Sequence, residues 1–296
     1  MDFRLTEDQR ALRRGVRDLL ARLFDRDALR AAVDVGVLDR GLWRELGAAG
    51  LFALRLPEEE GGVGLGLPEA VLVFEEAGRA LLPGPLVATH LAAGSVPGAA
   101  EGDVVVTEAA EGLVPWLDEA DVVLGDAQGA APMRSVDPLT PLHRVPAPGD
   151  GGGRGAGLTG FRHTAAVLLT AAEQVGSAER TTEAAVRYAR EREQFGTAIG
   201  GFQAVKHMCA GMLVRTELAR AAVRAASLTV DPVEAAGAKL LADRAATGNA
   251  RDCLQVHGGM GFTWEADVHL HLKRAWVRAE LRLPAARAEE TMAAAL

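Results

Sequence analysis

The sequence predicts a mainly α protein in which two helical regions flank a small β-region. Apolar residues recur at helical spacing in both halves, and Gly, Pro and Asp interrupt short apolar runs between them. Aromatic residues make up only 4 % of the 296 residues, which suits a core of Ala, Leu and Val better than a β-sandwich. We therefore expect an N-terminal helical domain over residues 1–97, a reduced β-region with a Gly-rich linker over 98–157, and a C-terminal helical bundle over 158–296.

Helix signals mark the N-terminal region. Thr6 and Gln9 are spaced as a capping box that begins the first helix. The buried stripe expected on that helix consists of Leu12, Val16, Leu19, Leu20 and Leu23. A short second helix is expected through residues 42–46. Pro68 suits the first position of a third helix, which ends at the Pro-Gly-Pro sequence of residues 83–85.

The middle of the chain predicts strands, and the last part predicts long helices. Apolar runs at 104–106 and 121–124 indicate strands, and the glycine-rich tract at 148–153 ends this region. Helices resume at about Phe161. A bundle-facing seam is predicted at alternating steps of four and three, by Val205, Cys209, Met212, Thr216, Ala219 and Val223. The next helix begins at Asp231, with a first-turn proline and a capping-box glutamate at Glu234.

Charge, cysteine content and hydropathy exclude several classes of protein. Acidic residues outnumber basic ones 40 to 32, and a net charge of -8 argues against a general binder of nucleic acid or anionic membranes. Cys209 and Cys253 form no CxxC pair and no disulfide framework. The start lacks a signal-peptide pattern, and no apolar run is long enough to span a bilayer. We expect a cytoplasmic protein.

Two clusters carry potential chemistry. In residues 190–203, Arg192, Phe195 and a glycine precede a new helix, so an arginine fork and free helix N–H groups could meet a phosphate. In residues 255–262, three glycines allow a backbone to approach a ligand closely. For each cluster alone, a helix that ends at a glycine cap is the better explanation.

Taken together, these segments resemble the acyl-CoA dehydrogenase family in order and spacing. The likeness covers residues 1–95 and 160–280. The matching C-terminal elements are Tyr188–Gly196, Phe202-Gln203, Gln255–Gly259, Glu265 and Arg274. The matching N-terminal elements are Asp2-Phe3, Leu5-Thr6, Pro57-Glu58-Glu59, the glycines from Gly61 to Gly66, and Phe74-Glu75-Glu76. The resemblance implies helices, a small β-domain and a C-terminal four-helix bundle that forms an oligomer interface.

The resemblance also implies FAD bound between subunits, with its adenosine diphosphate half held by the neighbouring chain. By position, Arg192 would bind the pyrophosphate, Phe195 would pack on the nucleotide and Gln203 would hydrogen-bond it. The second wall would be the backbone of Gln255, Val256, His257, Gly258 and Gly259.

The sequence departs from the family at its catalytic carboxylate. The family abstracts a proton α to a thioester carbonyl with a glutamate at one of two positions, which here are Ala166 and Leu283. Glu173 and Glu280 lie nearby, but one or two helical turns away, so we expect solvated or salt-bridged surface acids and no catalytic residue in this chain. Thr107-Glu108 resembles a flavin-proximal Thr-Glu pair without the proline that follows it, and the β-region is too short for a full flavin domain.

This asymmetry resembles the shorter subunits of α2β2 acyl-CoA dehydrogenases of bacterial steroid side-chain degradation. We expect a hetero-oligomer with a full-length homologous subunit, α,β-dehydrogenation of an acyl-CoA, and electron-transfer flavoprotein as acceptor. Steroid-CoA as substrate rests on that analogy. Two alternatives remain, a self-sufficient homotetramer with a displaced base and a flavin-free structural homologue. Metal is not expected, because Glu265 and His269 at helical spacing lack a third ligand.

Overall fold

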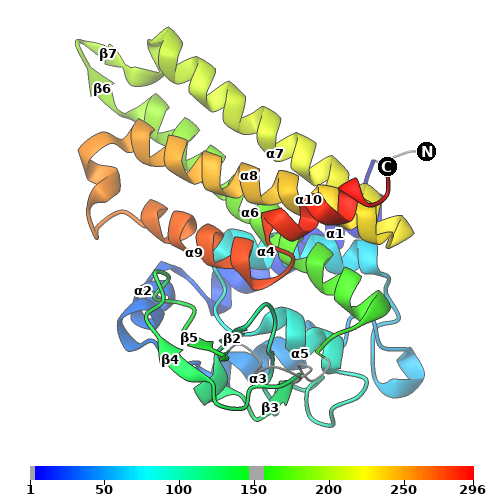
Figure 1. Ribbon diagram of the computed structural model, residues 1–296. Coiled ribbons are helices and arrows are strands. Elements are labelled where there is room, and N and C mark those ends of the chain that lie inside the picture. Colours follow the sequence, from blue (N-terminus) through cyan, green and yellow to red (C-terminus); the bar gives the residue numbers. More distant parts are fainter. Residues whose placement is uncertain (1–3, 147–156) are drawn as a thin grey trace.

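The computed structural model describes residues 4–146 and 157–296, and its helices form two groups with a small β-region between them in the sequence (Figure 1). The first group is α1 (Glu7–Leu23), α2 (Arg26–Val35), α3 (Arg40–Ala48), α4 (Leu67–Ala80) and α5 (Leu86–Ala92). The second group is α6 (Gly160–Glu191), α7 (Gln203–Thr229), α8 (Pro232–His257), α9 (Val268–Leu281) and α10 (Ala285–Ala293). The predicted mainly α fold class is confirmed. The Asp2-Phe3 start and the glycine-rich tract at 148–153 lie outside the described residues.

The β-region consists of short strands. β1 (Val106–Glu108) pairs in parallel with β3 (Val122–Leu124), which places strands where the sequence predicts them. A second sheet has the antiparallel order β2-β5-β4. Its strands are β2 (Leu113–Pro115), β5 (Leu142–Arg144) and β4 (Ala131–Met133). Val106 of β1 and Val122 of β3 pack with Ala92 of α5 in a small apolar cluster of their own.

Two of the predicted helix starts are present as expected. The Thr6 hydroxyl accepts the Gln9 N–H at 3.1 Å, and the Gln9 side chain accepts the Thr6 N–H at 3.0 Å, which completes the capping box of α1. Pro68 occupies the first turn of α4. Both signals depend only on neighbouring residues, so the sequence alone is sufficient to place them.

The third predicted start, that of α8, is correct only in part. Asp231 caps α8 and accepts the N–H groups of Val233 and Glu234. The capping box predicted with Glu234 is wrong. Its carboxylate accepts the hydroxyl of Thr229, the last residue of α7, and does not turn back to the cap.

Two helices, α2 and α5, were not predicted from the sequence. α2 has ordinary signals, since the Asp25 carboxylate accepts the Ala28 N–H at 2.9 Å and Gly36 ends the helix with a φ of 68°. α5 is seven residues long and buried at every position, so it presents no amphipathic pattern.

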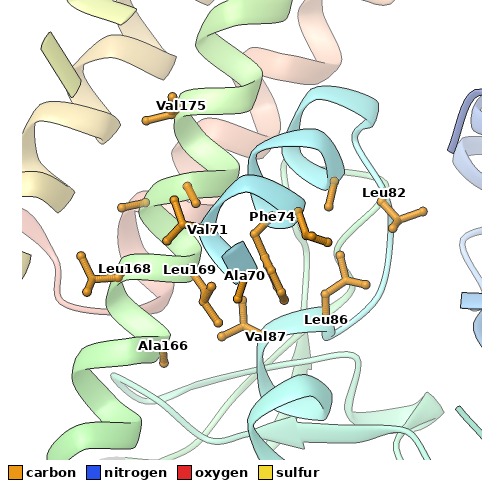
Figure 2. Packing of buried hydrophobic residues seen from close by; sticks show 14 of the residues in the cluster. Ala70, Val71, Phe74, Leu82, Leu86, Val87, Ala166, Leu168, Leu169 and Val175 are labelled. Atoms are coloured by element: carbon orange, nitrogen blue, oxygen red, sulfur yellow. The ribbon is translucent and has the colours of Figure 1, made fainter. Parts of the chain in front are cut away.

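The long helix α6 packs against α4, α7, α8 and α9. On α7 the predicted seam is confirmed as core at Met212, Thr216, Ala219 and Val223, whereas Val205 and Cys209 at its start are only half-buried. In Figure 2, Ala70 on α4, Val87 on α5 and Leu169 on α6 meet in one apolar cluster. None of the helices formed by residues 4–146 and 157–296 is both long enough and apolar enough to cross a membrane.

Glycines allow α4 and α6 to cross with their backbones in contact. A Cβ on Gly176 would lie 1.7 Å from the Glu75 carbonyl oxygen, and a Cβ on Gly78 would lie 2.0 Å from the Glu173 carbonyl oxygen. No side chain fits at either position unless the helices separate.

This crossing buries two carboxylates of α4. Glu75 is 0 % exposed and Glu76 is 1 % exposed. Glu76 accepts from Arg13 and Arg17 of α1 at 2.7 Å, and Glu75 accepts from Arg224 of α7 at 2.9 and 3.0 Å. Because an unpaired buried charge is costly, these arginines fix α1 and α7 onto α4.

The crossing generates a stability prediction. Gly176→Ala should lower the free energy of unfolding by about 1–3 kcal/mol or more, because the new methyl group overlaps a backbone carbonyl. The matched control is Gly15→Ala on α1, where no atom lies within 4 Å of the new Cβ. This control should stabilise the protein by up to about 1 kcal/mol through helix propensity. Urea unfolding of both variants measures the difference, and equal effects would contradict the close crossing.

Candidate functional site

The carried-over residues lie at the end of the bundle where α6 stops and α7 starts. Arg192 caps the C-terminus of α6, where its N–H donates to the Tyr188 carbonyl and its own carbonyl accepts from Ile199, both at 2.8 Å. Its side chain is exposed and forms no hydrogen bond or ion pair with any described residue. A guanidinium with free donors is therefore presented to a ligand.

Phe195 occupies the tip of a two-residue hairpin between β6 (Glu193–Gln194) and β7 (Thr197–Ala198). Its φ is 55° and that of Gly196 is 77°, so both residues are left-handed. A bulky residue rarely adopts this conformation, which costs roughly 1–2 kcal/mol. The ring is 95 % exposed and meets only the edge of Phe202, with centroids 6.2 Å apart. Strain and exposure together are typical of a binding residue.

Gln203 is the first residue of α7 and is exposed. Its side-chain amide donates to Nε2 of His207 at 3.1 Å. No side chain caps this helix, so the N–H groups of its first turn are left for solvent or an anion.

The second cluster ends α8. Gln255 is exposed, whereas Val256 is buried in the bundle core and can offer only its backbone. Gly258 has a φ of 58°, and a Cβ built on Gly258 or Gly259 would meet no atom within 4 Å. The glycines therefore leave open space beside the chain.

His257 joins the two clusters. Its ring stacks on Tyr188 of α6, with centroids 4.2 Å apart and planes 23° apart. Its Nδ1 donates to the Cys253 carbonyl at 2.8 Å, which fixes the ring, and burial raises the pKa of the Cys253 thiol to about 12. A groove of about 270 Å³ runs beside this stack, between α6 and the segment that follows α8. The guanidinium and the free helix N–H groups are donors that suit a diphosphate. The glycines leave room for a ligand, and the aromatic faces give a surface on which a base can pack.

A different chemistry lies where α9 faces the β-region. Three arginines spaced by four residues each pair with a buried acid from elsewhere in the chain. The pairs are Arg274 with Asp137, Arg278 with Glu173, and Arg282 with Glu108. All six residues are buried, and Glu173, Arg274, Arg278 and Arg282 line a small cavity of about 40 Å³.

Arg278 and His271 show how strongly this interior disfavours charge. Burial lowers the pKa of Arg278 to about 10, which still leaves the group protonated at neutral pH. Burial, followed by the charge of Arg180, lowers the pKa of His271 well below its usual value, so His271 is neutral and binds the Ser177 hydroxyl at 2.8 Å.

Sequence comparison identifies both halves of the chain. Residues 6–102 match the acyl-CoA dehydrogenase N-terminal domain, and residues 153–282 match the acyl-CoA dehydrogenase C-terminal domain. The acyl-CoA dehydrogenase IpdE2 of Mycobacterium tuberculosis is 39 % identical over 308 residues, and the match covers 93 % of each protein. The chain belongs to the acyl-CoA dehydrogenase family.

Solved structures share the fold of this acyl-CoA dehydrogenase chain. The ChsE4-ChsE5 complex from Mycobacterium tuberculosis gives a TM-score of 0.84 at 23 % identity, over 99 % of this chain and 98 % of that one. The Tcur3481-Tcur3483 steroid ACAD gives a TM-score of 0.82 at 24 % identity, over 97 % of each chain. Both likenesses extend over nearly the whole fold.

Ala166 and Leu283, the two positions at which the family resemblance leads us to expect the base, both belong to the main apolar cluster. Ala166 lies on α6 and is 0 % exposed, and Leu283 follows α9 and is 8 % exposed. Thr107 donates to the Pro115 carbonyl, and Glu108 accepts from the Leu158 N–H at 2.9 Å as well as from Arg282. The polar groups of the Thr-Glu pair are thus bonded within this chain.

The nearby acids have different surroundings. Glu280 is exposed, as expected. The expectation of a surface position for Glu173 is wrong, because Glu173 is 6 % exposed and paired with Arg278 at 2.7 Å. The missed signal was the spacing of the α9 arginines on one helix face, which indicates buried acids opposite them.

No group of three or more His, Cys, Asp or Glu side chains able to hold a metal occurs in the part of the chain that the structure describes. Glu265 precedes α9, so it does not share a helix turn with His269. His269 instead contacts the edge of Trp264, with centroids 4.7 Å apart.

The buried pair of Arg282 and Glu108 leads to a second prediction. Glu108→Gln should lower the free energy of unfolding by about 3–5 kcal/mol, because it leaves Arg282 buried without its counter-charge. The matched control is Glu111→Gln, which breaks the pair with the exposed Arg287 and should cost at most about 1 kcal/mol. Urea unfolding at pH 7 measures both, and a Glu108→Gln cost as small as the control would show that water reaches Arg282.

Proposed function

We propose that this chain is the reduced subunit of a heteromeric FAD-dependent acyl-CoA dehydrogenase. In this role it completes the FAD site of a full-length partner subunit and contributes no catalytic carboxylate. The assembly would contain two copies of each chain and would dehydrogenate an acyl-CoA thioester between its α and β carbons.

One observation carries the proposal, namely the contrast between the two ends of α6. At one end Ala166 and Leu283 occupy the base positions, and three arginine–acid pairs occupy the surrounding interior. A general base must lie within reach of the proton that it removes, and the buried acids Glu108 and Glu173 are each already held by an arginine. At the other end Arg192, Phe195 and the glycines are exposed and unoccupied by this chain's own side chains.

The exposed end fits the adenosine diphosphate half of FAD. Arg192 would bind the pyrophosphate, the Phe195 ring would pack on the nucleotide, and Gln203 would hydrogen-bond it. The backbone from Gln255 to Gly259 would close the other side. Bound FAD would accept the hydride that leaves the substrate.

An exposed apolar face supports assembly with another subunit. The seam of α7 packs inside this chain, but Leu213, Val214, Leu218 and Leu228 point outward and are 53 to 66 % exposed. Several large apolar side chains along one helix are typical of an interface. The ChsE4-ChsE5 complex and the Tcur3481-Tcur3483 steroid ACAD each pair two named chains in the same fold, which favours a heteromer and a steroid acyl group. The electron acceptor would be an electron-transfer flavoprotein.

The decisive experiment measures flavin per chain with and without the partner. The chain is purified alone and together with the full-length homologue encoded beside it, and the flavin absorbance is compared with the protein content. We expect no flavin on the chain alone, and one FAD for each pair of unlike chains in the complex. Sedimentation should show two copies of each chain, because the exposed apolar side chains of α7 are expected to be buried in a subunit interface.

Other outcomes select the alternatives. One FAD per chain without any partner would establish a self-sufficient homotetramer and would contradict the missing base. The absence of FAD from every complex of this chain would identify a flavin-free structural homologue.

Arg192→Ala tests the nucleotide site directly. Loss of a charge-assisted hydrogen bond costs about 1.5–3 kcal/mol, so FAD affinity in the complex should fall roughly 10- to 150-fold. Arg192→Lys should restore only part of it, because the planar fork is lost. The matched control is Arg244→Ala on α8, whose side chain is 72 % exposed and lies about 20 Å along the helix from His257. Equilibrium dialysis gives the affinity. A full flavin complement in Arg192→Ala would show that Arg192 does not bind FAD.

A further inference from the structure

An arginine-lined pocket lies between α1 and the C-terminal half of α7. It has a volume of about 470 Å³ and is lined by Leu5 and six arginines, namely Arg4, Arg10, Arg13, Arg14, Arg17 and Arg224. None of the described residues that line it is acidic. This concentration of positive charge occurs in a chain whose net charge is -8.

Three of these arginines have acidic partners behind the pocket. Arg13 and Arg17 pair with Glu76, and Arg224 pairs with Glu75. These pairs fix the three guanidinium groups in place, because both carboxylates are almost fully buried on α4. The pocket therefore has a rigid wall of arginine.

Arg10 and Arg14 differ from these three. Both are exposed, and neither side chain forms an ion pair or a hydrogen bond with a described residue. They lie four residues apart on α1, and each is three residues from another arginine of the same face. Like charges at these spacings destabilise a helix. An anion in the pocket would remove that repulsion and would use donors that the chain leaves free.

We propose that this pocket binds a multiply charged phosphate anion, with Arg10 and Arg14 as its direct ligands. A guanidinium presents paired N–H groups that match two phosphate oxygens, and two such forks suit a diphosphate. Inorganic diphosphate and a nucleoside diphosphate share this group, so either could be the ligand. Arg224 lies 21 residues beyond Gln203 on α7, about 32 Å along the helix, so this pocket is separate from the proposed FAD site and independent of it.

The test is calorimetric titration of the full chain with inorganic diphosphate at fixed ionic strength. Because the proposed FAD site is a second candidate for diphosphate, the titrations use the Arg192→Ala chain, in which we expect one site per chain. Arg10→Gln and Arg14→Gln should each weaken binding about tenfold or more, as expected when one charge-assisted contact is lost. The matched control is Arg22→Gln, which removes an exposed arginine of the same helix outside the pocket and should leave the affinity unchanged. Thermal unfolding of each variant verifies folding.

The remaining arms identify the ligand and separate this proposal from the previous one. Equal affinity for diphosphate and adenosine diphosphate assigns the pocket to the phosphate groups alone, and tighter binding of the nucleotide assigns it to a nucleoside diphosphate. Arg192→Ala should not change diphosphate binding here, and Arg10→Gln should not change the flavin content of the complex. The proposal is overturned if the double variant Arg10→Gln/Arg14→Gln binds diphosphate as well as the chain without these two changes, or if sulfate at equal ionic strength binds as tightly.

Discussion

The crossing of α4 and α6 is the constraint on which the rest of this structure depends. Because Gly78 and Gly176 lack side chains, the two backbones touch, and the acids beside them are carried into the interior. Glu75 and Glu76 then require cations on one side of the crossing, and Glu173 requires one on the other. Arginines of α1 and α7 meet the first requirement, and an arginine of α9 meets the second. Close packing of two helices thus determines the electrostatics of the helices around them.

The length of α6 then separates two kinds of site. Ala166 lies near its start and Arg192 just beyond its end, about 39 Å apart at the rise of a regular helix. At the first end Glu108 and Glu173 are each held by an arginine, and Glu280 is exposed to solvent. At the second end Phe195 has a strained backbone conformation, and its ring is almost fully exposed, so burial of the ring within this chain does not offset the strain. Since the two ends share no side chains, one can be lost while the other is kept, as the proposed role of a completing subunit requires.

Prediction from the sequence succeeded where the signal is local. The capping box of α1, the first-turn proline of α4 and the N-cap of α8 each involve residues within one turn, and all are present. It failed where the meaning of a residue depends on distant partners. The α9 arginines are visible as a repeat of four, but their acids come from three separate elements, and α5 has no polar face to reveal it. For the candidate site, the family resemblance gave the residues, whereas the Tyr188–His257 stack that joins them appears only in the fold.

The arginine pairs of α9 also explain why buried acids near the base positions are poor candidates for proton abstraction. A general base needs a free lone pair directed at the substrate and space for the substrate to approach. Glu108 already accepts from Arg282 and from the Leu158 N–H, and Glu173 accepts from Arg278. Freeing either carboxylate would leave a guanidinium buried without a counter-charge, which is far more costly than the gain of one catalytic contact. A glutamate placed at Ala166 or Leu283 would therefore enter an interior whose neighbouring acids are already paired with arginines.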